Sequence, residues 1–519
     1  MTWNSNFASE VERHGPKAWR YLLTRLPLPY TQNPGSYFSV GSSPANPQSW
    51  MVDAPIIAGA GVTVSSWLPQ VASCTVGVAI HSPADFAAFA QALPRGTAVS
   101  ITATSLFNGY QGTIWLGVIE SIDRVGAQCR VEMRSLFAAL RTRINNTQGS
   151  LFYELDRVIT ARVGSGGYTA GDSTITLTVS VPSAFRIDPA SGKGAAQVVP
   201  STGEPFIVTF TGTSGNDLTG VSSAGIMGTT PVNAVLNDAV YPCAYLEGHP
   251  YDIARRVLAS SSAGTNGSFD DYHESWGYGI DDALMDHADI TLAREAIEPY
   301  PSPSSPGGFT IVHAVTERQP AAFDWLAGFL STFGAWPVIR QGKITFRAAI
   351  DPKALTYGRL STPRPFLTRN DIISVSQGEV FGPTVAVRKY NRRIVYDGGN
   401  FAQGFSSPAT VFLPAESGIE DVVDLSQYLD VQADAENVAG RALRWDGFPP
   451  RVYTVTCRLR AALLAEGDWC YLGLDFIGTE IDPDFAAAAP IDRSVMVLAM
   501  TVDWARAQVA LTLAMTSAP

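Results

Sequence analysis

The chain has 519 residues and a formal net charge of −11, and only 16% of its residues are charged. A chain of this length exceeds one ordinary hydrophobic core, so we expect roughly three to four domains. The acidic balance and the lack of a long basic stripe exclude a protein that grips nucleic acid by neutralising phosphates. The low charge content, with 46 glycines and 34 prolines, favours β-rich domains that bury uncharged surface in an assembly over an ordinary β protein with a polar surface.

The cysteines, the N-terminus and the hydropathy argue against metal sites, secretion and membrane insertion. Zinc and iron–sulfur sites need clustered ligands, but no C-x-x-C pair is present, so we expect no metal and no cofactor. The odd number and wide spacing of cysteines suit synthesis in a reducing cytosol. The polar first residues are unlike a signal peptide, and no stretch approaches the ~18 apolar residues of a spanning helix. The cysteines are Cys74, Cys129, Cys243, Cys457 and Cys470.

Residues 1–150 are predicted to form an N-terminal, tube-like β-barrel domain with one helix. Ser82 offers a capping hydroxyl, Pro83 suits the first helical turn, and Asp85 favours the positive end of the helix dipole. Pro94 ends this helix. Alternating residues and an Asn-Gly turn then predict a meander of three strands, over residues 99–104, 114–122 and 129–133.

Residues 151–240 change in composition to glycine, serine, threonine and valine. Alternation predicts strands over residues 174–181 and 206–211. The segment is not polar or simple enough to be disordered, so we interpret it as a separate small β-domain inserted into the chain.

Residues 241–300 are predicted to form a helical connector, with helices over residues 250–258 and 284–293. Four prolines and two glycines make residues 299–308 the best linker candidate. Residues 301–390 follow as a helix plus β-hairpin domain. Its helix covers residues 320–333 and ends at Gly334, and its hairpin joins residues 336–340 to residues 343–347.

Residues 391–519 are predicted to form a C-terminal β domain that completes a second barrel. A strand region over residues 385–396 leads into it, and an alanine-rich helix covers residues 433–443. The closing strands are predicted over residues 452–459, 469–474, 495–502 and 507–514.

The densest polar cluster lies in the connector. A calcium or zinc site is one interpretation, but the alternating ligands of a calcium loop are absent. We favour an exposed turn followed by acids that stabilise the N-terminal end of a helix. The cluster comprises Asp270, Asp271, His273, Glu274, Asp281, Asp282, Asp286 and His287.

No stretch of the sequence has the residue spacing that a known catalytic motif requires. The stretch Gly212-Thr213-Ser214-Gly215 lacks the last glycine of a nucleophile elbow, and no phosphate-binding loop is present. The sequence leaves open the possibility of two carboxylates placed as in a glycosidase. We nevertheless predict that the protein is not an enzyme and has no catalytic residue. Several aromatics suit a core or an interface better than a platform for sugar rings, namely Trp276, Tyr278, Trp325, Trp445 and Trp469.

Several stretches occur in an order that resembles the tail hub (baseplate hub or tail-tip) proteins of long-tailed bacteriophages. They begin with the helix 250–258, the Gly-Thr-Asn-Gly turn at 264–267 and the segment Trp276-Gly277-Tyr278-Gly279-Ile280. The stretch 206–228 is similar to a small β-domain inserted in such proteins. It departs from the usual Arg-Gly at Ser222-Ser223-Ala224-Gly225.

Two later stretches extend the resemblance, which covers roughly residues 200–515. The helix 321–333 and its hairpin resemble the hub's helix and hairpin. The stretch 439–469 resembles a common tail-protein ending, in which a strand leads to the turn Glu466-Gly467-Asp468 and a further β-strand.

The resemblance implies a mainly β, multi-domain fold with some α: two tail-tube-like β-barrel domains, the inserted β-domain and short helices. It implies a homotrimeric virion protein at the tail tip, synthesised in the bacterial host cytoplasm. The trimer would join the hexameric tail tube and distal tail proteins to tip or fibre proteins, and gate DNA that passes through its lumen without specific binding. The alternatives are a receptor-binding tail protein that recognises host-surface glycans and, less favoured, a cell-wall hydrolase.

Overall fold

The computed structural model places four predicted segments outside the residues that it describes: the polar turn 264–271, the aromatic–glycine segment 276–280, the linker 299–308 and, except for Val438, the helix 433–443. The described residues are 5–13, 19–26, 49–63, 67–80, 82–126, 128–141, 155, 161–188, 191–259, 284–297, 311–317, 322–349, 366–368, 370–380, 387–391, 409–410, 420–424, 438, 451–472 and 494–515.

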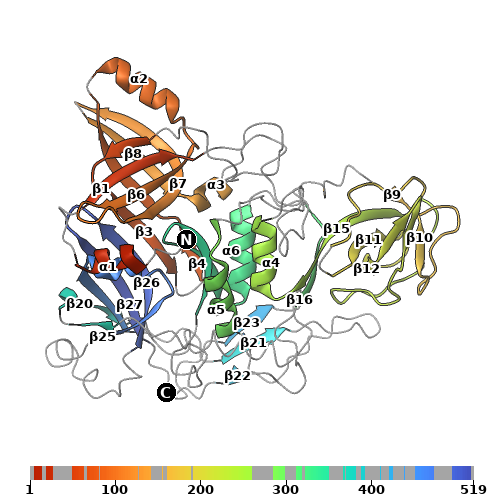
Figure 1. Cartoon of the computed structure of the whole chain (residues 1–519). Helices are drawn as coiled ribbons and strands as arrows, with labels where there is room; N and C mark the ends of the chain where they lie inside the picture. The colour runs from red at the N-terminus through yellow and green to blue at the C-terminus, as the bar shows by residue number, and fades with distance from the viewer. Residues whose placement is uncertain are drawn as a thin grey trace.

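Six antiparallel strands form the N-terminal β unit, in the order β2-β1-β6-β7-β8-β5 (Figure 1). The predicted meander is confirmed, because β6 pairs with β7 and β7 pairs with β8. The two ends of the run approach each other where the N–H of Asp53 donates to the carbonyl of Gly77 at 2.8 Å. The strands are β1 (Trp19–Arg25), β2 (Ser49–Val52), β5 (Ser73–Ala79), β6 (Ala98–Ser105), β7 (Gln111–Val125) and β8 (Gln128–Ser135).

The C-terminal β unit contains the predicted closing strands, which are confirmed. Neighbours β24 and β27 pair antiparallel, as do β27 and β26. The strands are β20 (Ile372–Val380), β24 (Arg451–Arg458), β25 (Trp469–Leu472), β26 (Ser494–Asp503) and β27 (Gln508–Met515).

One 14-stranded sheet joins the two β units. Strand β3 (Ile56–Thr63) pairs with β26 along one edge, and with β5 and then β4 (Leu68–Gln70) along the other. The mainly β class is therefore confirmed. The two units, predicted as barrels, are parts of an open sheet, and the described strands form no closed barrel. Local sequence patterns cannot reveal a pairing between strands that lie about 440 residues apart.

Helix α1 (Ser5–Arg13) fastens the N-terminus to the sheet. Phe7 and Val11 are fully buried in the hydrophobic cluster that both β units share. The buried carboxylate of Glu10 accepts from Ser105 Oγ and Asn108 Nδ2, each at 2.8 Å. This helix was not predicted from the sequence.

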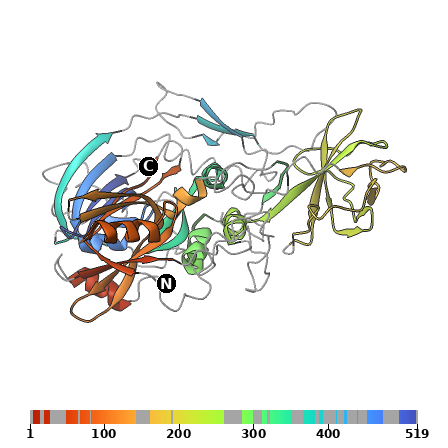
Figure 2. The ribbon, with the colours of Figure 1, turned by 90° about the horizontal axis from the view of Figure 1, so that it is seen from above.

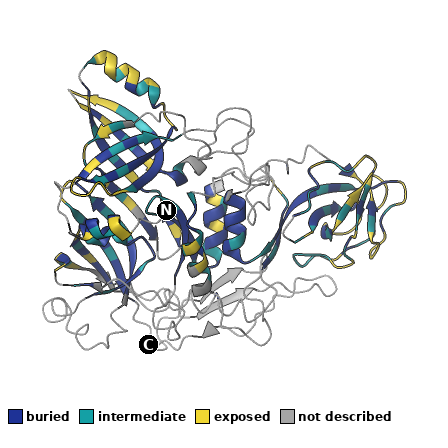
Figure 3. Cartoon of the chain, viewed as in Figure 1, coloured by how far each residue is buried: buried dark blue, intermediate teal, exposed yellow. Residues whose placement is uncertain are grey.

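Helix α2 (Pro83–Ala92) confirms the predicted helix. Ser82 Oγ accepts from the N–H of Asp85 at 3.1 Å, as a capping residue does. Phe89 is buried, but most of the helix is exposed at the outer end of the N-terminal unit (Figure 3).

The inserted β unit has its own hydrophobic cluster, which includes Phe206, Val208 and Phe210. It projects from the rest of the chain (Figures 1 and 2). The predicted strand 206–211 is confirmed as β12 (Phe206–Phe210), whereas only Thr174–Thr176 of the predicted strand 174–181 forms a strand, β10. The remaining strands are β9 (Ala161–Arg162), β11 (Gly194–Val199), β13 (Gly212–Ser214), β14 (Asp217–Thr219) and β15 (Ala239–Gly248).

The central unit packs helices against the predicted hairpin, β17 (Ala335–Arg340) and β18 (Lys343–Ala348). All three predicted helices are confirmed, with α5 starting three residues later than expected, and Gly334 has the predicted left-handed φ of 64°. Strand β15 reaches this unit from the insert and pairs with β16 (Ile311–Val315). The helices are α4 (Pro250–Ala259), α5 (His287–Ile297) and α6 (Ala322–Thr332).

The remaining elements are short. Helix α3 (Leu136–Arg141) follows β8, and the 3-10 helix Leu459–Leu463 follows β24. No helix within the described residues is long and apolar enough to cross a membrane. The other strands are β19 (Phe366–Leu367), β21 (Val387–Asn391), β22 (Ala409–Thr410) and β23 (Glu420–Asp424), and β21 falls within the strand region predicted at residues 385–396.

Candidate functional site: a buried charged joint

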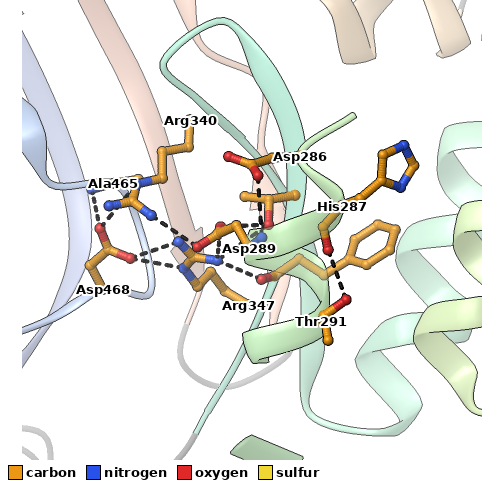
Figure 4. A network of polar contacts seen from close by, with 10 residues as sticks. Asp286, His287, Asp289, Thr291, Arg340, Arg347, Ala465 and Asp468 are labelled. Atoms are coloured by element: carbon orange, nitrogen blue, oxygen red, sulfur yellow. Dashed lines mark hydrogen bonds and ion pairs between the residues drawn. The ribbon is translucent and has the colours of Figure 1, made fainter. Parts of the chain in front are cut away.

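Three segments that are distant in sequence, one of them a hairpin, meet around Arg347 (Figure 4). They are the first turn of α5, the two strands of the β17–β18 hairpin, and the turn that precedes β25. The side chain of Arg347 is only 10% exposed. We call this contact between the central unit and the C-terminal β unit the joint.

The guanidinium of Arg347 lies between two carboxylates. Its Nη1 donates to Asp289 Oδ2 at 2.7 Å, and its Nε donates to Asp468 Oδ1 at 2.9 Å. Asp289 also accepts from Arg340 Nη1 at 2.9 Å and from Thr345 Oγ1 at 2.7 Å. Two arginines therefore balance two aspartates, and each carboxylate bonds a segment other than its own.

The charges of the joint stabilise one another. Burial raises the pKa of Asp289, but Arg347 and Arg340 outweigh burial and hold that pKa below its usual value. Burial lowers the pKa of Arg347, and Asp468 and Asp289 reverse this and raise it. Both groups are thus ionised throughout the physiological range, and the joint acts as a permanent ionic contact.

A glycine lets the last segment approach Arg347. Gly467 has a φ of 80°, which favours glycine, and its N–H donates to the carbonyl of Val497 at 2.7 Å. A Cβ at this position would lie 2.6 Å from the Cβ of Arg347 and 2.8 Å from Cζ2 of Trp336. The side chain of Asp468 closes the turn by accepting from the N–H of Ala465 at 2.9 Å.

Aromatic stacking brings the start of β4 to the same place. Trp67, just before β4, stacks on Trp336 of β17 with ring centroids 5.4 Å apart and an angle of 11° between the rings. A cavity of about 90 Å³ lies beside this stack. The joint therefore lies where three parts of the chain meet.

Glu466 lines this cavity, and the residue is 6% exposed. The pKa of its carboxyl group is raised from 4.5 to about 7, because burial and, to a smaller extent, the charge of Asp468 raise it more than its own backbone N–H and Arg347 lower it. Because the folded pKa exceeds the unfolded one, the resulting stabilisation is complete below pH 4.5 and is lost as the pH rises through 7.

The variant Glu466→Gln is expected to remove this pH dependence. With 1.36 kcal/mol per pKa unit, the wild type should lose roughly 3 kcal/mol relative to the variant between pH 4.5 and 8. Denaturant unfolding of both proteins across this pH range measures the difference. A difference in stability that stays constant with pH would contradict the assignment.

The structure places two residues of the predicted polar cluster, Asp286 and His287, at the start of α5. Asp286 Oδ1 accepts from the N–H of Asp289 at 3.2 Å, which confirms the helix-terminus interpretation for Asp286, although its side chain is buried and not exposed. The other members of that cluster lie outside the described residues: Asp270, Asp271, His273, Glu274, Asp281 and Asp282.

The residues of the joint were not predicted as a site. Asp289, Arg340 and Arg347 gave no motif, because their partners lie between 51 and 121 residues away in the chain. A usable signal was the alternation of β18, where Lys343, Thr345 and Arg347 share one face and the apolar Ile344, Phe346 and Ala348 share the other.

The structure describes two of the aromatic residues for which a core or interface position was predicted over a sugar-binding platform. Trp469 is buried in the core, and Trp325 stacks on Phe329 with centroids 5.0 Å apart, so the core interpretation is confirmed for both. Trp276, Tyr278 and Trp445 lie outside the described residues.

The chemistry of the joint suits a mechanical contact. Its carboxylates are occupied by arginine and hydroxyl donors, so they are not arranged to accept protons from a substrate. Across the described residues, no three or more His, Cys, Asp or Glu side chains are grouped to hold a metal ion. All five cysteines are buried, and none of them forms a disulfide.

No family model and no curated protein matches the chain. The tail protein from Neisseria meningitidis MC58 is similar in structure, with 10% identity, a TM-score of 0.39, and coverage of 96% of this chain and 98% of that one. The 43 kDa tail protein of prophage MuSo2 from Shewanella oneidensis has 8% identity, a TM-score of 0.32, and coverage of 96% and 97%. A Francisella PdpA-VgrG complex has 7% identity, a TM-score of 0.37, and coverage of 99% and 61%.

Phage tail proteins are thus among the solved structures that this chain resembles. All three TM-scores lie below 0.5. We therefore base the following proposal on the residues and the fold of the chain itself.

Proposed function

We propose that the chain is a non-enzymatic structural subunit of a phage tail, and that three copies form the hub at its distal end. The observation that carries this proposal is the single sheet in which two β units lie side by side. Three subunits with two such units each present six similar surfaces to a six-fold tube, and three to the tip or fibre below it. The ordered resemblance of residues 200–515 to tail hub proteins supports the same assignment.

In this role the joint transmits force. Contacts made at the tip during host binding shift the units and open the lumen to DNA. The joint couples the central unit to the C-terminal β unit through buried charges, so both move together. The net charge of −11 repels DNA and lets it pass without binding.

The purified protein is expected to have three times the 55.5 kDa mass of one chain. Light scattering coupled to size-exclusion chromatography measures this mass, and electron microscopy of the same sample should show a three-fold ring. A monomer in solution that also enters assembled tails singly would contradict the hub.

The second candidate function is recognition of host-surface glycans by the inserted β unit. Its separate hydrophobic cluster and its projection from the sheet favour a recognition role (Figure 1). The N–H of Val163 donates to the carbonyl of Asp238 at 2.9 Å. Because the two ends of the segment 164–237 therefore lie next to each other, this segment can be deleted as a whole. We expect the deletion to abolish binding on a glycan array and to leave the trimer intact. Glycan binding that survives the deletion would contradict the role.

A further inference from the structure

The cavity beside the joint is lined by three parts of the chain. The N-terminal β unit contributes Trp115 and Ser135, the hairpin contributes Trp336 and Arg340, and the turn before β25 contributes Glu466. Its volume of about 90 Å³ is several times the ~10–15 Å³ that admits the centre of one water molecule. A small molecule with several polar atoms therefore fits.

Three buried neutral donors belong to residues that line this cavity, as does the Nε of Arg340, which likewise has no hydrogen-bond partner among the described residues. Trp115 Nε1, Ser135 Oγ and Trp336 Nε1 have no hydrogen-bond partner among the described residues, and their side chains belong to residues at most 5% exposed. An unsatisfied buried donor costs roughly 1–3 kcal/mol, and native proteins pair nearly all of them. Three such donors around one cavity indicate a ligand that supplies acceptor oxygens.

The charges around the cavity favour a neutral ligand. Arg340, the cation that lines the cavity, is balanced by Asp289 at 2.9 Å and by Asp468 at 3.8 Å. An anion would find no uncompensated positive charge among the lining residues, and Glu466, which also lines the cavity, would repel it when ionised. A hydroxyl group can accept from the indole N–H groups and donate to Glu466, and indole rings also provide apolar walls.

We propose that the cavity binds small neutral hydroxylic molecules, whose oxygens accept from Trp115, Ser135 and Trp336. Water and a polyol the size of glycerol share this chemistry. The ligand then bridges the N-terminal β unit to the hairpin through hydrogen bonds that the protein atoms do not make directly. This inference goes beyond the proposed function, because it concerns binding inside one subunit, and its tests do not depend on tail assembly.

The effect of removing a donor distinguishes a bound ligand from a dry cavity. If a ligand occupies the site, Ser135→Ala and Trp336→Phe lose a hydrogen bond, and the midpoint of thermal unfolding should fall by roughly 2–4 °C in each. If the cavity is dry, Ser135→Ala removes an unsatisfied group and the midpoint should stay constant or rise. That outcome would overturn the proposal.

Thr97 supplies the matched control. Its hydroxyl is buried and has no partner among the described residues, but Thr97 does not line the cavity. Thr97→Val should therefore leave the midpoint constant or raise it, in contrast to Ser135→Ala. If Thr97→Val and Ser135→Ala lower the midpoint by the same amount, the result for Ser135→Ala no longer supports a bound ligand.

Two crystal structures identify the ligand, one from a glycerol-free solution and one from a solution with glycerol. Separate oxygen peaks within hydrogen-bond distance of Ser135 Oγ in both crystals identify water, and connected density that appears only with glycerol identifies a polyol. Both results support the proposal. A cavity without density in either crystal overturns it.

Discussion

Replacement of Arg347 by methionine is expected to lower the free energy of unfolding by roughly 3–5 kcal/mol. Methionine keeps most of the side-chain volume but removes the cation that lies between Asp289 and Asp468. The two carboxylates are 13% and 15% exposed, so both would stay buried with too little positive charge. Denaturant unfolding followed by tryptophan fluorescence measures the loss.

Two further variants test whether charge is the cause. Adding Asp289→Asn and Asp468→Asn to the methionine variant removes the unpaired charges and should recover part of the stability. Arg130→Met breaks an exposed pair with Glu132 at 3.0 Å, in which the side chains are 57% and 39% exposed, and should cost at most about 1 kcal/mol. Equal losses at Arg347 and Arg130 would show that the joint contributes no more than a surface ion pair.

Gly467→Ala is expected to cost roughly 2–5 kcal/mol. Part of this cost is the left-handed backbone, since φ is 80° at this residue. The rest arises because the new methyl group would lie 2.6 Å from the Cβ of Arg347, against a buried side chain that is fixed by two carboxylates. The variant should separate the turn from the hairpin and show faster hydrogen exchange at the start of β25.

Gly109→Ala is the control for the backbone component. Gly109 has a φ of 70°, but nothing lies within 4 Å of a Cβ built there. We expect a loss of about 1–2 kcal/mol from the conformation alone. If both alanine variants lose the same stability, close packing against Arg347 is not what requires Gly467.

Local elements of the fold could be predicted from the sequence because their signals are local. The capped helix that starts at Pro83, the hairpin around Gln341-Gly342 and the strand ending at Arg458 all follow from neighbouring residues. The continuous sheet could not be predicted, because the pairing of β3 with β26 depends on two edges that no sequence neighbourhood connects. The sequence patterns therefore predicted two separate barrels and not one continuous sheet.

The joint shows the same limit. Resemblance singled out the turn that contains Gly467 and Asp468, but only as a common ending of tail proteins. Its chemistry depends on Arg347, which lies 121 residues earlier than Asp468, and on Asp289 in a helix still further away. Charged residues at such separations become a site only when the fold brings them together.

The pairing of β3 with β26 also sets an order of events during synthesis. A ribosome adds roughly 5–20 residues per second, so β3 waits on the order of 20–90 seconds for a partner that lies about 440 residues later. During that interval the N-terminal unit has an open strand edge, which invites pairing with another nascent chain. Nascent chains that are translated from the same mRNA would thus be most vulnerable to aggregation just before their last strands emerge from the ribosome.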